Sequence, residues 1–207
     1  KKNDGSDYVP PKPDGYNFGG KPVTLIKNSQ DDEIVIDCQG SRTSPGRAFI
    51  FENGEGPETR IIGLTIKNGF TAGAVGSDGG DVSFDPNYAN RGEDASGNGY
   101  GGAIYINNSS PTFENCLIQN CLVAGGIGGN GVDGLSEFNY SDEGQSAGDG
   151  GDGNGNGFGG AVYCKGQKSN PSFTRCVFLN NAAQGGQGGD GGDGGDADES
   201  ALAGSGG

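Results

Sequence analysis

The chain has 207 residues, of which 46 are glycine and only 30% are hydrophobic, and it contains no histidine, methionine or tryptophan. Such a composition cannot supply a broad apolar core along the whole chain, and without histidine a Ser-His-Asp triad or a histidine base is excluded. The formal net charge of −14 argues against nucleic acid and anionic membrane surfaces as partners. The sequence contains no run of 18 apolar residues, so we expect no membrane insertion of this segment.

The first part of the chain differs in composition from the rest. Residues 1–20 contain several prolines and glycines, which predict a linker or a frayed N-terminal turn. Residues 21–207 are expected to form the folded part, as a fragment of a longer protein. Within them, residues 23–26 and 34–37 are short runs rich in β-branched residues, and such runs are typical of strands.

An internal repeat follows and is the most informative feature of the sequence. Its three copies span residues 48–73, 101–126 and 159–186, and each carries short alternating segments such as 103–106, 112–113 and 116–119. In register, the copies align apolar columns: Phe49/Ile104/Val162, Ile61/Phe113/Phe173 and Ile66/Ile118/Phe178. Short strands that cannot bury a face alone can do so by stacking on the next copy. The repeat therefore predicts an all-β parallel β-helix, a solenoid of about three coils with three strands per coil.

Two polar columns accompany the apolar ones. Asn68, Asn120 and Asn180 end the three copies, and we expect them to form a structural amide ladder rather than a catalytic group, because buried amides need partners. Cys116 aligns with Cys176, and we expect the two to stack. A buried, free cysteine column is favoured over a disulfide, although stacked residues lie within disulfide reach. With no C-x-x-C and no histidine, a zinc site is not expected.

Long glycine-rich insertions interrupt the repeat at about residues 71–100, 125–158 and 185–207. They contain Gly-Gly-x triplets, such as GGIGGNG at 125–131 and GGQGGDGGDGGD at 185–196. A period of three suits an extended three-fold helix of the polyproline II type, and chains without Cβ can pack closely. The insertions are therefore expected to pack as polyglycine II-like arms, with flexible glycine-rich loops as the alternative.

The insertions also carry the candidate binding residues. The segment GGNGVDGLS, containing Asp133, matches a calcium-binding nonapeptide, and Asp190, Asp193 and Asp196 recur at every third position. Rows of oxygen ligands can hold calcium or stay hydrated, so calcium is the one candidate cofactor. Aromatic residues at the tips are expected to contact a partner or to pack back on their own arm. These residues are Phe84, Tyr88, Phe138 and Tyr140.

The units GGAIY…SPTFENC and GGAVYC…NPSFTRC resemble the body of right-handed parallel β-helix repeat proteins of bacterial secretomes, and residues 19–69 resemble their opening coils. The GGA-[ILV] element is similar to the repeats of polymorphic outer-membrane proteins, although the companion FxxN element matches only at 178–181. The insertions resemble polyglycine bundles of certain phage tail-tip adhesins. The resemblance implies a right-handed solenoid that is extracellular or at the cell surface.

These observations predict a structural or adhesive solenoid, a repeat segment of a surface fibre, filament or adhesin. The expected partners are further copies or a larger parent chain, with a cell-surface glycan as another candidate. The alternative is a polysaccharide-binding or lyase-type polysaccharide-cleaving β-helix protein, in which Arg175 is a candidate base. Because acidic residues do not recur beside the basic ones, an enzyme is not the favoured interpretation.

Overall fold

The computed structural model describes residues 10, 15–28, 33–79, 91–134 and 147–193. These residues form strands, turns and extended segments, and no helix occurs among them. None of them therefore forms an apolar helix long enough to span a bilayer. The chain divides into two compact units, each assembled from three separate stretches. Unit 1 comprises Lys1–Ala72, Gly99–Ala124 and Gly157–Gln184, and unit 2 comprises Gly73–Asn98, Gly125–Asn156 and Gly185–Gly207.

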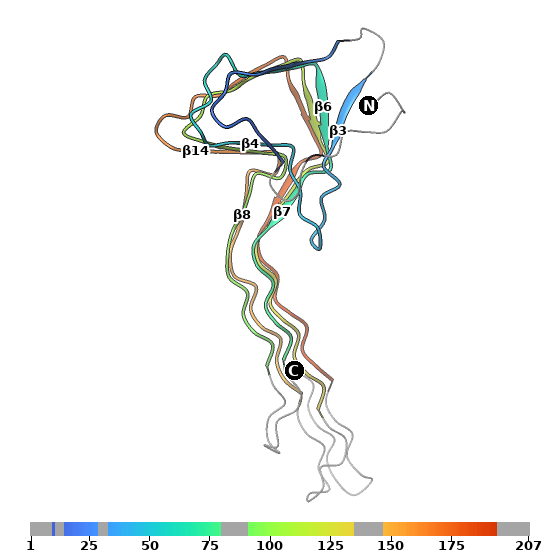
Figure 1. Ribbon diagram of the computed structural model, residues 1–207. Helices are drawn as coiled ribbons and strands as arrows, with labels where there is room; N and C mark the ends of the chain where they lie inside the picture. The colour runs from blue at the N-terminus through green and yellow to red at the C-terminus, as the bar shows by residue number, and fades with distance from the viewer. Residues whose placement is uncertain (1–9, 11–14, 29–32, 80–90, 135–146, 194–207) are drawn as a thin grey trace, which may run out of the picture. The chain divides into compact units, whose positions relative to one another are not determined.

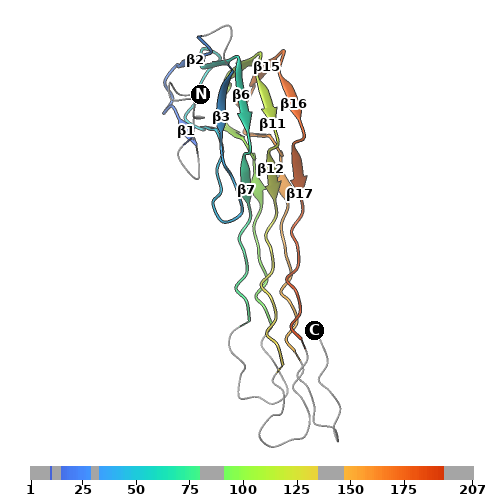
Figure 2. The ribbon, with the colours of Figure 1, turned by 90° about the vertical axis from the view of Figure 1, so that its right-hand side faces the viewer.

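Unit 1 consists of parallel sheets, each built from equivalent strands of successive repeat copies (Figure 1 and Figure 2). The first sheet holds β1 (Tyr16–Asn17), β4 (Phe49–Phe51), β9 (Ile104–Asn107) and β14 (Val162–Lys165). The second holds β2 (Thr24–Ile26), β5 (Arg60–Ile62), β10 (Thr112–Glu114) and β15 (Ser172–Thr174). The third holds β3 (Ile34–Asp37), β6 (Leu64–Lys67), β11 (Leu117–Gln119) and β16 (Val177–Leu179).

A fourth sheet and a short strand pair complete unit 1. The fourth sheet holds β7 (Phe70–Ala72), β12 (Leu122–Ala124) and β17 (Ala182–Gln184), and the pair is β8 (Gly99–Tyr100) with β13 (Gly157–Phe158). The sequence predicted three strands per copy and assigned no strand to these residues. That prediction was wrong, because small side chains such as Ala182 and Ala183 give no alternating apolar signal. Their pairing rests on backbone hydrogen bonds between copies.

The strand registers confirm the predicted columns. Ile104 pairs with Phe49 on one side and with Val162 on the other. Phe113 pairs in the same way with Ile61 and Phe173. Ile118 lies likewise between Ile66 and Phe178. Parallel strands stacked in this order are compatible with a β-solenoid.

The core of unit 1 follows from the two-residue period of its strands. In β9, Ile104 and Ile106 are fully buried, whereas Tyr105 and Asn107 are only partly buried, because successive side chains point to opposite faces of a strand. Inside, the rings of Phe51 and Phe113 meet edge to face at 5.9 Å. A one-residue slip would expose the whole apolar set, so burial itself holds the register.

The N-terminal boundary of unit 1 lies earlier than predicted. Residues 1–20 were expected to be a linker or a frayed turn, yet β1 lies within them. The Tyr16 amide donates to the Ala48 carbonyl at 2.8 Å, and Tyr16 pairs with Phe49 in register. Tyr16 and Phe18 also pack their rings against Phe49, at 6.2 and 6.0 Å between centroids. This segment therefore belongs to the stacked sheets.

Candidate functional site

Unit 2 is held together by backbone hydrogen bonds between segments far apart in the sequence. One chain of bonds crosses five segments in turn. The Glu93 amide donates to the Ser77 carbonyl at 2.8 Å, and the Gly129 amide to the Glu93 carbonyl at 2.9 Å. The Gly151 amide then donates to Gly129 at 2.7 Å, and the Gly189 amide to Gly151 at 2.8 Å. Such bonds need backbones in direct contact, with no side chains between them.

Steric exclusion explains the glycines of unit 2. A Cβ added to Gly129 would overlap the carbonyl oxygen of Ser77, and one added to Gly151 would overlap that of Glu93. By contrast, a Cβ added to Gly185 would meet nothing within 4 Å. Glycine is thus required where another backbone approaches closely. The glycines of the triplets therefore mark positions that face a neighbouring segment.

Asp and Asn residues at the third position of several triplets have a structural role of their own. The Asp78 carboxylate accepts the Asn130 backbone amide at 2.8 Å, and the Asn130 side chain accepts the Asp190 amide at 3.0 Å. The Asp133 carboxylate accepts the Asp193 amide at 2.8 Å. We call this series the Asx ladder. It satisfies backbone amides that would otherwise lack a protein acceptor.

The returning segments of unit 2 continue the Asx ladder. The Asp94 carboxylate accepts the Asp152 amide at 2.7 Å, and the Asn98 side chain accepts the Asn156 amide at 2.8 Å. The hydrogen bond from Asp152 lowers the pKa of Asp94, and Arg91, whose guanidinium lies 2.8 Å from the carboxylate, lowers it further. Asp94 is therefore an ionised hydrogen-bond acceptor at neutral pH.

The candidate calcium ligands are thus placed in part. Asp133, Asp190 and Asp193 belong to the Asx ladder, while Asp196 lies outside the described residues. Within the described part of the chain, no three His, Cys, Asp or Glu residues converge as a metal site. Calcium binding stays a prediction. The tip residues predicted to contact a partner all lie outside the described residues, namely Phe84, Tyr88, Phe138 and Tyr140.

The asparagine column has a different role from the predicted ladder. Asn68, Asn120 and Asn180 adopt φ values of 56°, 54° and 52°, in the left-handed region that asparagine tolerates better than most residues. The side-chain amide of Asn68 donates to the Asp37 carboxylate at 3.0 Å. Within the described residues, no hydrogen bond joins the side-chain amides of the three asparagines to one another. The column therefore turns the backbone at each copy.

The side-chain amide that bridges two copies lies one residue further along. Asn181 accepts the Cys121 backbone amide at 2.9 Å through its Oδ1, and its Nδ2 donates to the Ile118 carbonyl at 2.9 Å. One amide thus satisfies both a donor and an acceptor of the preceding copy. A double asparagine at 180–181 was the signal that could have revealed this division of roles.

The cysteines of unit 1 are free thiols. Cys116 is buried, and its burial raises the pKa of its thiol. Burial also raises the pKa of Cys121 to about 11. Both thiols are therefore protonated at neutral pH and pack as small apolar groups. Cys176, in the last copy, is only partly buried.

Glu55 is a buried carboxylate that sequence patterns did not reveal. It is 1% exposed and accepts the amides of Gly20 and Asn53 and the hydroxyl of Ser109, each at 3.0 Å. Burial raises its pKa, but these hydrogen bonds, with that of its own amide, outweigh burial, and the net pKa is lowered. Gly20 precedes the first repeat copy, Asn53 lies in the first copy and Ser109 lies in the second, so Glu55 holds these three segments together as an ionised staple.

The candidate basic catalyst, Arg175, is also engaged in structure. Its Nε donates to the Asn115 side chain at 2.7 Å. Its backbone has φ of 51°, in a left-handed turn at the position where Asn115 has φ of 53°. Arg175 therefore makes a structural contact between two copies, from a turn on the surface.

An aromatic face on unit 1 was also missed. Tyr105 pairs with Tyr163 across β9 and β14, and Tyr100 pairs with Phe158 across β8 and β13. Their centroids lie 5.9 and 5.6 Å apart, and the second pair is stacked at 12°. Lys165 lies beside the Tyr105 ring. The signal was present in the sequence as GYGGAIY and GFGGAVY.

Comparison with protein-family models, curated proteins and solved structures finds no match to this chain. Its relation to parallel β-helix repeat proteins is therefore a resemblance carried by the GGAIY and GGAVY units and by the stacked parallel sheets.

Proposed function

We propose that the chain is a structural or adhesive element of an extracellular or cell-surface fibre, built to associate end to end. In this proposal unit 1 is a right-handed parallel β-solenoid, in which the three repeat copies stack on an opening coil from residues 16–37, and unit 2 consists of polyglycine II-like arms. No catalytic role is assigned to it.

The order of strands favours a solenoid. Each of the first three sheets carries one strand from each repeat copy, preceded by a strand from residues 16–37. The chain therefore visits the sheets in the same sequence in every copy. For unit 2, the backbone bonds among Glu93, Gly129 and Gly151 favour packed arms over flexible loops, because ordered glycines repay their entropy only through such contacts.

The observation that supports stacking of further copies is the exposure of inward-facing columns in the last described copy, an edge that a second copy or a longer parent chain would cover. Ile66 and Ile118 are fully buried, whereas Phe178, the next residue of the column, is 48% exposed. Its strand β16 is an edge strand, with β11 on one side only. An exposed apolar edge of this kind is a ready template for another strand.

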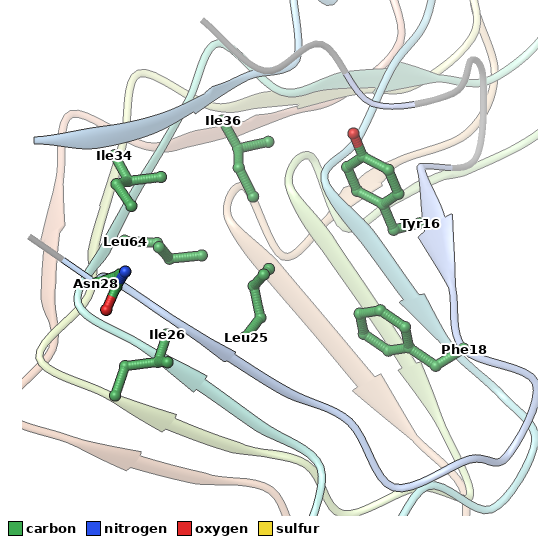
Figure 3. A pocket seen from close by; sticks show the side chains of 8 residues that line it. All are labelled: Tyr16, Phe18, Leu25, Ile26, Asn28, Ile34, Ile36 and Leu64. Carbon is green, nitrogen blue, oxygen red and sulfur yellow. The ribbon is translucent and has the colours of Figure 1, made fainter. Parts of the chain in front are cut away.

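The opposite edge of unit 1 offers a complementary surface. A pocket of about 460 Å³ opens beside β1, β2 and β3, each the edge strand of its sheet. Figure 3 shows Tyr16, Phe18, Ile34 and Ile36 around this pocket. Leu25, Ile26, Asn28 and Leu64 complete its lining. A second copy that added its β16 beside β3 would continue the parallel sheet and place Phe178 over the Ile36 column.

The test compares an edge variant with a middle-strand variant. We expect the purified chain to form filaments that lengthen with concentration, as seen by negative-stain electron microscopy and sedimentation velocity. Phe178→Asp places a charge on the exposed edge and should abolish them. Gln119→Asp adds the same charge to β11, a middle strand, and should leave the filaments intact.

Two outcomes would contradict the proposal. A wild-type chain that sediments as a monomer at every concentration would remove end-to-end association. Equal loss of filaments in both variants would show that added negative charge, rather than the edge of β16, controls assembly.

A further inference from the structure

The aromatic face of unit 1 presents a continuous strip of rings. It consists of Tyr100, Tyr105, Phe158 and Tyr163, contributed by two successive copies. The Tyr100 and Tyr163 centroids lie 4.7 Å apart, and those of Tyr105 and Tyr163 lie 5.9 Å apart, so the rings form one surface.

These rings are accessible although apolar. Phe158 is 40% exposed, and the three tyrosines are half-buried. Tyrosine combines an apolar ring with a hydrogen-bonding hydroxyl, which suits contact with an amphipathic ligand. A contiguous exposed group of rings is typical of a binding surface, whereas a single exposed ring is not.

Two cations flank one ring of this face. The Lys165 Nζ lies 5.4 Å from the Tyr105 centroid, and the Arg47 guanidinium carbon lies 5.3 Å from it. A hydrogen bond to the Tyr105 side chain raises the pKa of Lys165, and the negative charge of an ionised Tyr105 would raise it further. Lys165 is therefore a fixed positive charge at neutral pH.

Lys165 differs from other cations of unit 1. Arg60 lies 2.6 Å from the Glu114 carboxylate, and Lys67 lies 3.3 Å from that of Asp37. The groups described around Lys165 are tyrosines rather than carboxylates. Its charge can consequently be neutralised by a ligand that supplies an anion.

The local charge outweighs the net charge at this distance. The Debye length is about 8 Å at physiological ionic strength, so the −14 of the whole chain is largely screened. The nearest acid along the Lys165 column is Glu52, which follows β4 two strands away, on the order of 10 Å. An approaching anionic group therefore meets Lys165 before it meets an acid of this column.

We propose that this face binds an acidic polysaccharide, a chain containing uronic acid residues. The rings of Tyr105, Tyr163 and Phe158 lie against the apolar faces of sugars, and Lys165 pairs with a carboxylate. Rings repeated on successive copies suit a repeating polymer, since each further contact adds avidity. The proposal is independent of end-to-end association.

The test is affinity gel electrophoresis of the full chain in gels containing polygalacturonate or neutral galactan, with chelator present to exclude calcium bridging. We expect polygalacturonate to retard the chain and galactan not to do so. Lys165→Gln should weaken the apparent affinity by roughly fivefold or more, as expected for loss of a charge-assisted contact. Tyr163→Ala should weaken it by a similar factor.

Lys168→Gln is the matched control, because it removes the same charge from an exposed residue outside the aromatic face. It should leave the retardation unchanged, and circular dichroism of each variant should match the wild type. The proposal is overturned if polygalacturonate does not retard the chain, if galactan retards it equally, or if both lysine variants weaken binding alike. It is also overturned if Tyr163→Ala changes the sedimentation of the free chain but not its retardation, because the face would then join copies of this chain.

Discussion

In both units, residues about one repeat apart in the sequence bond to each other. The groups that hold the copies together differ between the two units. Arg175 bonds to Asn115 in unit 1 and Asp193 bonds to Asp133 in unit 2, and both pairs are 60 residues apart. In unit 1, alternating apolar side chains form a core around Phe113. In unit 2, backbones contact one another directly, and the Asx residues add side-chain acceptors for backbone amides.

The comparison teaches that repetition alone does not require an apolar core. A side-chain core loses stability when atoms are removed, because cavities form. A backbone core loses stability when atoms are added, because no space exists for them. Opposite kinds of substitution should therefore damage the two units.

The largest effect is expected from Phe113→Ala. Phe113 is fully buried between Ile61 and Phe173 and contacts the ring of Phe51, so its removal should cost about 3–5 kcal/mol. Phe173→Ala, in the same column but at the partly exposed last copy, should cost less than half as much. Chemical denaturation followed by circular dichroism measures both values, and equal losses would contradict a core that ends at the last copy.

Gly129→Ala should have the next largest effect, on unit 2. The added methyl would overlap the Ser77 carbonyl and break the bonds to Glu93 and Gly151, at a cost of about 1–3 kcal/mol. Hydrogen–deuterium exchange should show faster exchange in unit 2 and unchanged exchange around β9.

Gly185→Ala is the matched control for that prediction. It adds the same methyl group where nothing lies within 4 Å, and it should leave exchange in unit 2 unchanged. Equal protection in the two variants would show that the glycine segments are not packed as described.

A third comparison separates two carboxylates that accept backbone amides, and the smallest effect is expected from the exposed one. Glu55→Gln removes a buried charge held by three hydrogen bonds and should cost about 1–3 kcal/mol. Asp94→Asn, on exposed Asp94, keeps an acceptor for the Asp152 amide and should have little effect on stability. Thermal unfolding at neutral pH measures both variants.

The pH dependence of Glu55 follows from the direction of its shift. Its folded pKa is lowered, so its contribution is present above the unfolded value of about 4.3 and is lost as pH falls through the lower folded pKa. Below about pH 4.3 the wild type should therefore lose stability more steeply than Glu55→Gln. Parallel profiles would show that Glu55 is not held as an ionised staple.

The sequence by itself determined the columns and the limits of the insertions. Ile104 over Val162 and Ile118 over Phe178 could be predicted because both follow from alternation and repetition, which are local properties. The predicted insertion at 125–158 lies close to the observed stretch Gly125–Asn156 for the same reason. Where a glycine triplet begins, side chains can no longer form the core.

Only the tertiary structure decided which columns meet. The fourth sheet, the staple formed by Glu55 and the aromatic face of Tyr105 and Tyr163 depend on contacts between stretches distant in sequence. The role of Asn120 as a left-handed turn, with Asn181 as the bridging amide, depends on backbone geometry. A periodic pattern specifies which residues repeat, but partners across a turn are set by packing in three dimensions.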